Sequence, residues 1–365
     1  MKSLFFGDGK DEKNQGSKNW YVPVRYTNHF EGSGGDPGFI SDLYYADIYD
    51  GEDNFSSWDT DGDGIFAYWH RFWGKDEIDM FPEVFVGRLA CRNIFEVKIM
   101  VNKIISYEST PADPDWFNNF VAVAGDTHND SDTNYYEGEL MCDYVLDNYL
   151  TNFNPVKLYA SNNDIDTLHV CSTENIIREI SAGCGHIFFT GHGSPGVWDT
   201  HWPLDFRWSD TPGGIGCYDF FSLNNKEKLP ICIVEACHNS QFNVTWLTYG
   251  RGYPECWSWW LTRKIGGGAI ATLGHTGLSY EIIGENGDLD GDGVNLPDCL
   301  ETVCGFQNLR FYETIGEGVD ILGEVWGETI NKYLTTFPGM EAQIDAKTIS
   351  QWVLLGDPSL KIGGY

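Results

Sequence analysis

The sequence predicts an α/β protein built on a mostly parallel β-sheet with helices on both faces. Beyond residue 114, short apolar segments alternate with segments of helical periodicity. The apolar segments are uninterrupted by polar residues, which is typical of parallel strands that are buried on both faces. With 365 residues, of which 42% are hydrophobic, the chain is long and apolar enough to form such a core.

The first 114 residues are less regular than the rest. Residues 1–79 are rich in Gly, Asp, Asn and aromatic residues, and residues 82–88 (PEVFVGR) indicate a short buried strand. A helix is expected over residues 94–108, because Asn93–Glu96 has the form of a capping box and apolar residues follow at helical spacing. Prolines 111 and 114 then indicate a linker, so we expect two parts, residues 1–114 and 115–365.

The second part supplies the elements of the sheet. Strands are expected at residues 120–124, 156–159, 186–189, 231–234 and 268–273. Helices are expected at residues 139–150, 173–181 and 256–263.

Three chemically reactive residue types follow three of these strands. Asp126 follows residues 120–124, His192 follows residues 186–189, and Cys237 follows residues 231–234. In open α/β sheets, ligands bind at the carboxyl ends of the strands. A thiol beside an imidazole is the pairing needed for nucleophilic catalysis, although a single Cys is more often an inert core residue. Gly193, next to His192, lets the backbone approach a substrate carbonyl and direct an N–H group at it.

Composition excludes several function classes. The net charge is −31, from 23 Lys and Arg against 54 Asp and Glu, so the surface repels nucleic acid and anionic membranes. No apolar run is long enough to span a bilayer, and Met1–Phe6 is too short for a secretion signal. Ten Cys without CxxC pairs exclude a zinc ribbon, and the lack of an HExxH motif argues against a zinc hydrolase.

Two acidic loops, residues 59–65 and 288–294, each contain the pattern DxDxDG. Alternating carboxylates, a glycine turn and a following carbonyl are what a Ca²⁺ loop requires. The expected ligands are Asp59, Asp61, Asp63 and Ile65 in one loop and Asp288, Asp290, Asp292 and Val294 in the other. The twelfth positions hold His70 and Cys299 instead of Glu, so these are not EF-hands; the alternative is a pair of ion-free turns.

Five motifs in order resemble the gingipain-type cysteine peptidases, the C25 family. They are PEVFVGRLACRN with the helix after it, FFTGHGSPGVW, LPICIVEACHNSQF, GGAIATLGHTGLSY and VLLGDPSLKI. The resemblance implies a caspase-like fold for residues 115–365, with residues 1–114 as the remainder of a smaller α/β subdomain. It also implies that an N-terminal segment or propeptide is missing here and that the protein is secreted.

The resemblance also assigns roles to residues. Cys237 matches the nucleophile and His192 the general base, with the N–H groups of Gly193 and Cys237 as the oxyanion hole. Asp126 matches an acid that orients the histidine. Trp198 and Tyr280 would line the pocket for the residue before the scissile bond. Glu139, or failing that Glu137, would meet an Arg or Lys side chain there.

The sequence therefore predicts a Ca²⁺-stabilised cysteine endopeptidase that cleaves proteins or peptides after Arg or Lys and needs no organic cofactor. A transpeptidase of the same family and a calcium-binding surface module with a degenerate site stay open as alternatives.

Overall fold

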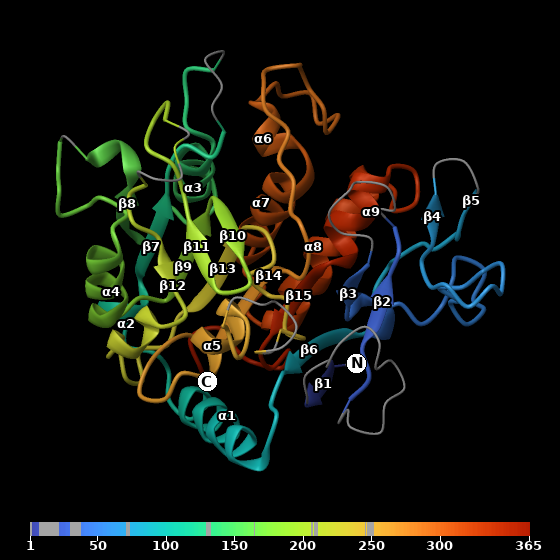
Figure 1. The fold of residues 1–365 in the computed structure, drawn as a ribbon, viewed down its shortest axis with the longest axis horizontal. Coiled ribbons are helices and arrows are strands. Elements are labelled where there is room, and N and C mark those ends of the chain that lie inside the picture. Colours follow the sequence, from blue (N-terminus) through green and yellow to red (C-terminus); the bar gives the residue numbers. More distant parts are fainter. Residues whose placement is uncertain are drawn as a thin grey trace.

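The computed structural model describes residues 2–6, 22–29, 38–70, 74–128, 133–163, 165–205, 207, 211–244, 246 and 252–365, with the backbone alone for residues 2–6. Its centre is a six-stranded sheet (Figure 1). In spatial order the strands are β15 (Trp352–Leu355), β14 (Ala271–His275), β13 (Ile231–Glu235), β9 (His186–Thr190), β7 (Asn119–Ala124) and β8 (Asn154–Tyr159). Every neighbouring pair is parallel except β14 and β15, so the expected mostly parallel sheet is confirmed.

Helices cover both faces of this sheet because alternate strand residues point to opposite sides. Phe120 and Ala122 of β7 belong to a buried cluster with α3 (Glu137–Asn148) and α7 (Val303–Gly316). Val121 and Val123 belong to a second cluster with α4 (Thr173–Ala182) and α5 (Trp257–Arg263). Strands that are buried on both faces explain why their sequences are continuously apolar.

The expected elements of the second part are confirmed with small shifts at their ends. Helix α3 begins at Glu137, two residues before the expected start. The last strand, β15, precedes the GDPSL motif, whose residues form a turn. Three of the longer helices were not predicted, and all are largely buried: α7, α8 (Leu322–Thr336) and α9 (Gln343–Ser350). The short helices α2 (Pro114–Phe117) and α6 (Asp298–Glu301) complete this part.

The first part is built from short elements. Strand β6 (Phe85–Leu89) pairs in parallel with β1 (Lys2–Phe6), and α1 spans Ile94–Glu108 with Asn93 as its N-cap, as expected. Two small antiparallel pairs precede them: β2 (Arg25–Thr27) with β3 (Phe39–Ser41), and β4 (Trp69–His70) with β5 (Gly74–Lys75).

The two parts share one buried core. Val86 and Leu89 of β6 lie in the same apolar cluster as Leu354 of β15. Lys103 of α1 also donates hydrogen bonds to carbonyl groups in the last turn of α5 and after it, at 2.6 Å from Thr262 O and 2.7 Å from Ala269 O. The hydrophobic core is continuous across residue 114 and does not mark the expected boundary. That boundary stays a prediction. Among the described residues, no helix is long and apolar enough to cross a membrane.

Candidate active site

The site lies at the carboxyl ends of three adjacent strands. β9 is hydrogen-bonded to β13 on one side and β7 on the other, and all three run in parallel. Each strand is followed two residues later by one of the expected side chains: Asp126 after β7, His192 after β9 and Cys237 after β13. The parallel register therefore brings the three loops to the same edge of the sheet, as the sequence predicted.

A small antiparallel sheet carries the histidine. It consists of β10 (His192–Ser194), β11 (Val197–Asp199) and β12 (Ile215–Gly216). Asn239, two residues beyond Cys237, holds this sheet by donating from Nδ2 to the carbonyl oxygens of Ser194 at 2.6 Å and Val197 at 3.0 Å. The histidine hairpin and the cysteine turn are thus joined by a buried amide, a contact that sequence reasoning missed.

Gly193 lies directly against the cysteine turn. A Cβ atom at this position would lie 2.5 Å from the carbonyl oxygen of Cys237 and 2.5 Å from Oδ1 of Asn239. Such distances are not tolerated, so glycine is required for the hairpin and the turn to approach this closely. This packing places Gly193 beside Cys237. The role of the Gly193 N–H group as a donor to the oxyanion stays a prediction.

The imidazole of His192 has a defined orientation. Its Nε2 atom lies 2.7 Å from the carbonyl oxygen of Thr127, which can only accept a hydrogen bond. Nε2 therefore carries the proton, and Nδ1 of the neutral ring is left as the basic nitrogen. Burial lowers the pKa of His192; the hydrogen bond to Thr127 opposes this, and the nearby His128 adds to it. The neutral, proton-accepting form is favoured as a result.

Cys237 differs from the other cysteines. All ten are unpaired, nine are buried, and Cys237 alone is partly exposed. Its Sγ atom lies 3.5 Å from Oγ and 3.6 Å from the carbonyl oxygen of Ser279. For Cys142, Cys171 and Cys232, burial raises the thiol pKa well above its usual range, which makes them unreactive.

Asp126 lies in the site, but its carboxylate has a partner other than Nε2 of His192. Its Oδ2 atom accepts a hydrogen bond from the N–H of Leu204 at 2.6 Å, and its own N–H group bonds to the carbonyl of His201. The acceptor at Nε2 is the next residue's carbonyl group. At Nε2, the backbone carbonyl of Thr127 therefore orients the histidine, a role that the resemblance assigns to Asp126. A contact to a backbone carbonyl cannot be read from a side-chain motif.

Two expected pocket residues lie elsewhere. Trp198 has no exposed surface and packs edge-to-face on Phe189, so it supports the hairpin from the core instead of facing a substrate. Glu139 is bound by Ser161, whose N–H and Oγ lie 2.9 and 2.5 Å from its two oxygens. Tyr280 is partly exposed on the segment after β14, with Lys347 facing its ring.

Buried acids that were not predicted lie beside Cys237. Burial raises the pKa of Glu235 well above its usual range, and the charges of Glu281 and Cys237 act in the same direction. Glu281 forms an ion pair with Nε2 of His128 at 3.0 Å, with almost no exposed side chain. Glu137, the second of the two expected pocket acids, is buried as well, and burial raises its pKa to about 7, with Glu281 as the next contributor. The sequence contained a clue to Glu281, because this acid directly follows Tyr280, which was already an expected wall of the pocket.

Both acidic loops gather their carboxylates. Asp59, Asp61 and Asp63 have oxygens within 4.8 Å of one another, and so do Asp288, Asp290 and Asp292. The second loop precedes α6, which packs against α3 near the active-site edge, whereas the first lies in the N-terminal part (Figure 1). Ile65 and Val294 follow the last Gly of each pattern, as a carbonyl ligand would.

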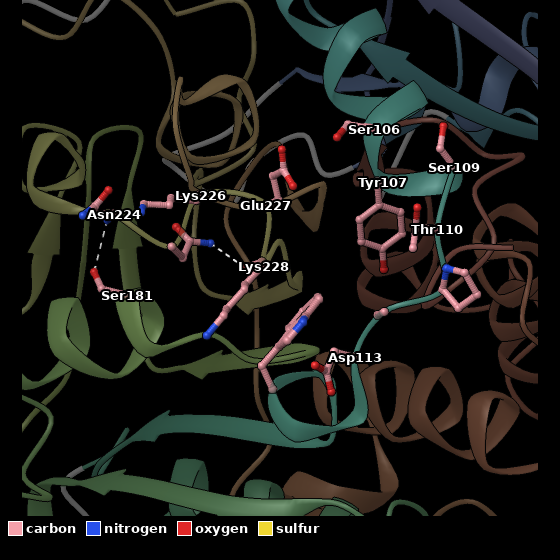
Figure 2. A pocket seen from close by; sticks show the side chains of 14 residues that line it. Ser106, Tyr107, Ser109, Thr110, Asp113, Ser181, Asn224, Lys226, Glu227 and Lys228 are labelled. Atoms are coloured by element: carbon pink, nitrogen blue, oxygen red, sulfur yellow. Dashed lines mark hydrogen bonds between the residues drawn. The ribbon is translucent and has the colours of Figure 1, made fainter.

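A cavity of about 1090 Å³ lies away from these loops (Figure 2). Its walls come from the segments that lead into β7, β9 and β13, including Trp116, Ser181 and Lys228. It therefore sits at the amino ends of the strands and shares no residue with the site.

Comparison with known proteins decides the family. The model of peptidase family C25 matches residues 3–363. The chain belongs to peptidase family C25. Gingipain R2 of Porphyromonas gingivalis is 26% identical over 165 residues, which cover 45% of this chain and 20% of that protein. Gingipain R1 of the same species is 26% identical over 165 residues, with 15% of its length covered.

Solved structures of this C25 family confirm the fold. The crystal structure of the Arg specific cysteine proteinase gingipain R (RgpB) matches with a TM-score of 0.63 at 20% identity, covering 98% of this chain and 63% of that one. The complex of P. gingivalis RgpB pro- and mature domains matches with a TM-score of 0.60 at 18% identity, covering 98% and 64%. The expected caspase-like fold is thus confirmed, and the chain spans less than two thirds of these relatives.

Proposed function

We propose that this chain is a cysteine endopeptidase with Cys237 as nucleophile and His192 as general base. The observation that carries the proposal is that the one partly exposed cysteine lies against the hairpin of a histidine whose Nε2 is already committed to Thr127. The relatives supply the reaction class, since they belong to the same peptidase family.

The reaction follows from this arrangement. Sγ of Cys237 attacks the carbonyl carbon of the scissile bond while its proton passes to Nδ1 of His192. The N–H groups of Gly193 and Cys237 would receive the oxyanion. The amine leaves with the proton from Nδ1, and the acyl group stays on sulfur as a thioester. Water then attacks the thioester, gives a proton to Nδ1, and the released thiolate recovers it.

A preference for Arg or Lys before the cut is proposed on two grounds. Gingipain R is described as Arg specific. In this chain, Glu281 lies two residues after Ser279, which contacts Sγ of Cys237, and it is buried next to Glu235. A guanidinium or ammonium group would neutralise this cluster, and we propose Glu281 as the acid that it meets, displacing His128. Tyr280 is retained as a wall of this pocket.

Calcium binding by the two acidic loops is proposed from their shared geometry. In each loop the N–H of the second Gly bonds to the first Asp, at 3.0 Å for Gly64 to Asp59 and 2.9 Å for Gly293 to Asp288. The N–H groups of Ile65 and Val294 bond to Asp63 and Asp292, both at 2.7 Å. Two loops far apart in the sequence thus adopt the same conformation, and each brings three carboxylates close together. A bound hard cation such as Ca²⁺, which prefers oxygen ligands, would relieve the repulsion between these carboxylates.

Substrates are proposed to be proteins or peptides met outside the cell. The RgpB complex contains a pro-domain bound to its mature domain. By analogy, a propeptide is a proposed partner of this chain.

The test is turnover of a peptide library by three variants. Cys237→Ala and His192→Ala should abolish cleavage, whereas Cys232→Ala, which removes a buried thiol on the strand that leads to Cys237, should retain it. The library should also show cleavage after Arg or Lys. Cleavage by Cys237→Ala at the wild-type rate would reject the nucleophile, and cleavage after acidic residues would reject the proposed pocket.

A further inference from the structure

We infer that Glu137 is a positioning residue of the active site, which holds the Thr127–His128 peptide so that its carbonyl group orients His192. The inference rests on the proposed Cys237–His192 dyad. It gives Glu137 a different task from the binding of a substrate side chain. Glu137 is the first residue of α3 and has no exposed surface.

One carboxylate oxygen of Glu137 accepts two backbone hydrogen bonds. Oε2 lies 3.2 Å from the N–H nitrogen of Thr127 and 3.1 Å from that of His128. The second of these N–H groups belongs to the same peptide unit as the Thr127 carbonyl. That carbonyl oxygen is the atom 2.7 Å from Nε2 of His192. A single peptide unit is therefore bound by Glu137 at one end and by His192 at the other.

The planarity of the peptide bond makes this link directional. The N–H and C=O groups of one peptide unit are fixed in a common plane and point in opposite directions. Fixing the N–H of His128 therefore fixes the direction of the Thr127 carbonyl. A hydrogen bond from the N–H to a carboxylate also polarises the unit and makes its carbonyl oxygen a better acceptor.

Packing holds Glu137 in place. The next residue, Gly138, is so close to its surroundings that a Cβ atom would lie 2.5 Å from Oγ1 of Thr190 and 3.0 Å from the carbonyl oxygen of Gly125. Thr190 ends β9 and Gly125 follows β7, so the start of α3 is wedged against both strands that lead into the site. The position of the Glu137 carboxylate is thereby fixed relative to the histidine.

The other oxygen of Glu137, Oε1, is buried and has no hydrogen-bond partner among the described residues. This atom leaves open the opposite assignment, in which Glu137 meets a basic substrate side chain. The two assignments predict different kinetics. A positioning residue affects the reactivity of the thiol with every electrophile, whereas a pocket residue affects basic substrates alone.

The experiment compares Glu137→Ala, Glu137→Gln and Glu137→Asp with a matched control. Glu83 provides the control, because its Oε2 also accepts two consecutive backbone N–H groups, from Ile48 at 2.6 Å and Tyr49 at 3.1 Å, outside the active site. Two readouts are taken on folded protein: the rate of Cys237 alkylation by iodoacetamide across pH, and kcat and KM for a peptide with Arg before the cut. Melting temperature reports folding.

Glu137→Ala should lower both the alkylation rate and kcat by about tenfold to a hundredfold with KM nearly unchanged, because the imidazole loses its fixed acceptor. Glu137→Gln keeps an acceptor oxygen at the same reach and should stay within about threefold of wild type. Glu137→Asp withdraws that oxygen and should fall between them, which keeps the test valid if the Ala variant does not fold. Glu83→Ala should lower the melting temperature alone.

Wild-type alkylation and kcat in folded Glu137→Ala or Glu137→Asp would overturn the inference. So would a rise in KM for the Arg peptide with an unchanged alkylation rate, since that result marks a pocket residue. Failure of the dyad itself is seen separately, as alkylation or turnover that survives in Cys237→Ala.

Discussion

Nε2 of His192 lies 2.7 Å from the carbonyl oxygen of Thr127, so a backbone group fixes the tautomer of this imidazole. The family resemblance assigns this task to a carboxylate at Asp126, yet Oδ2 of Asp126 caps the N–H of Leu204 at 2.6 Å. A carbonyl acceptor is neutral, so it orients the ring without adding a negative charge that would raise the pKa of the imidazole.

The activity of this site should extend to weakly acidic pH. Burial lowers the pKa of His192, so its neutral form persists below the usual value and the acid limb of kcat/KM should lie below pH 6.5. The charge of His128 lowers this pKa further, and His128 is also the ion-pair partner of Glu281. His128→Ala removes the cation and leaves Glu281 unpaired, so the acid limb should move to higher pH.

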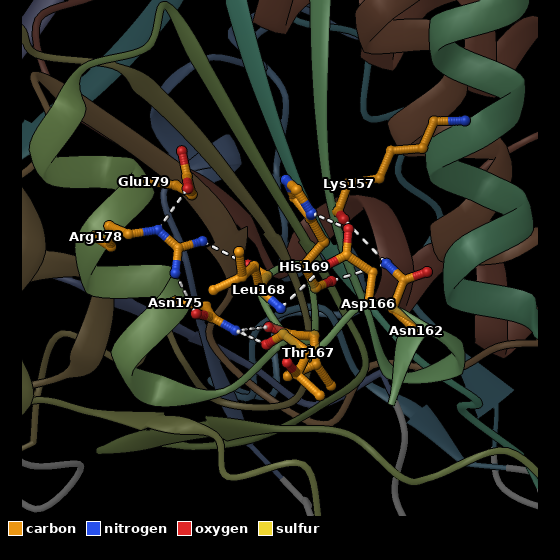
Figure 3. Close-up of polar contacts among 10 residues, drawn as sticks. Lys157, Asn162, Asp166, Thr167, Leu168, His169, Asn175, Arg178 and Glu179 are labelled. Atoms are coloured by element: carbon orange, nitrogen blue, oxygen red, sulfur yellow. Dashed lines mark hydrogen bonds and ion pairs between the residues drawn. The ribbon is translucent and has the colours of Figure 1, made fainter. Parts of the chain in front are cut away.

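The control for this pH profile is a histidine paired with an acid outside the site. Nδ1 of His169 lies 2.6 Å from Oδ2 of Asp166 in the segment before α4 (Figure 3). His169→Ala should leave the acid limb where it is. An unchanged limb in His128→Ala would contradict the assigned coupling to His192.

Gly193→Ala should strongly reduce the proposed peptidase activity without unfolding the protein. Its Cβ would lie 2.5 Å from the Cys237 carbonyl oxygen and 2.9 Å from Cβ of Ala236, so the hairpin must move away from the nucleophile. A displacement of this kind costs about a hundredfold in kcat/KM. Gly216→Ala, in the same small sheet, has its nearest contact at 3.5 Å and should stay close to wild type. Equal activities of the two variants would refute the steric argument.

Calcium should stabilise the protein through both acidic loops but support activity through one. The residues that flank the second loop are tied to the active-site edge, because Gly284 O accepts hydrogen bonds from Tyr135 Oη at 3.0 Å and from Asp298 N at 2.9 Å. At a hundredfold excess over Kd, each site contributes about 2.7 kcal/mol. Asp290→Ala should therefore reduce both thermal shift and Ca²⁺-dependent turnover, and Asp61→Ala the thermal shift alone. No change in melting temperature between Ca²⁺ and EDTA would reject both sites.

The buried carboxyl group of Asp47 should make stability depend on pH. Burial raises its pKa to about 7, opposed by hydrogen bonds that include Trp58 Nε1 to Oδ2 at 2.8 Å. Because the folded pKa exceeds the unfolded one, the native state holds an extra proton between about pH 4 and 7, and its free energy of unfolding falls as pH rises through that range. The slope is at most about 1.4 kcal/mol per pH unit.

Asp47→Asn cannot lose that proton. Urea denaturation should therefore show the variant gaining stability relative to wild type from pH 5 to 7, with a constant difference above pH 7. A difference independent of pH would contradict the assigned titration.

The sequence predicted the parts of this fold that have a simple pattern. Strands β7, β9 and β13 are continuously apolar because both faces are covered, and their order brought Asp126, His192 and Cys237 to one edge. Helix α7 was missed because it is buried on several sides and lacks a single apolar stripe. Helix α8, in contrast, has such a stripe, which includes Leu322, Val325 and Trp326, and its periodicity was sufficient to predict it. The start of α3 was missed because Gly138, a poor helix residue, is required there by close packing.

The site was harder to predict in its acids than in its dyad. Glu137 and Glu139 are two residues apart on one helix, so their side chains point about 200° apart. One reaches the Thr127 and His128 N–H groups and the other reaches Ser161. Which of these two acids faces the site depends on how the helix is rotated about its axis, and the sequence does not specify that rotation. The contact of Thr127 uses a backbone carbonyl, a group that every residue possesses, so no residue type indicates it.

The most direct test of the central claim is mass-spectrometric mapping of a peptidyl chloromethyl ketone that ends in Arg. Such a reagent needs both the basic side-chain pocket and a thiol activated by the imidazole. One label per chain is expected, on Cys237; it should be lost in His192→Ala and form slowly with an analogue ending in Ala. A label on another cysteine, or equal labelling of Cys237 in His192→Ala, would contradict the central claim.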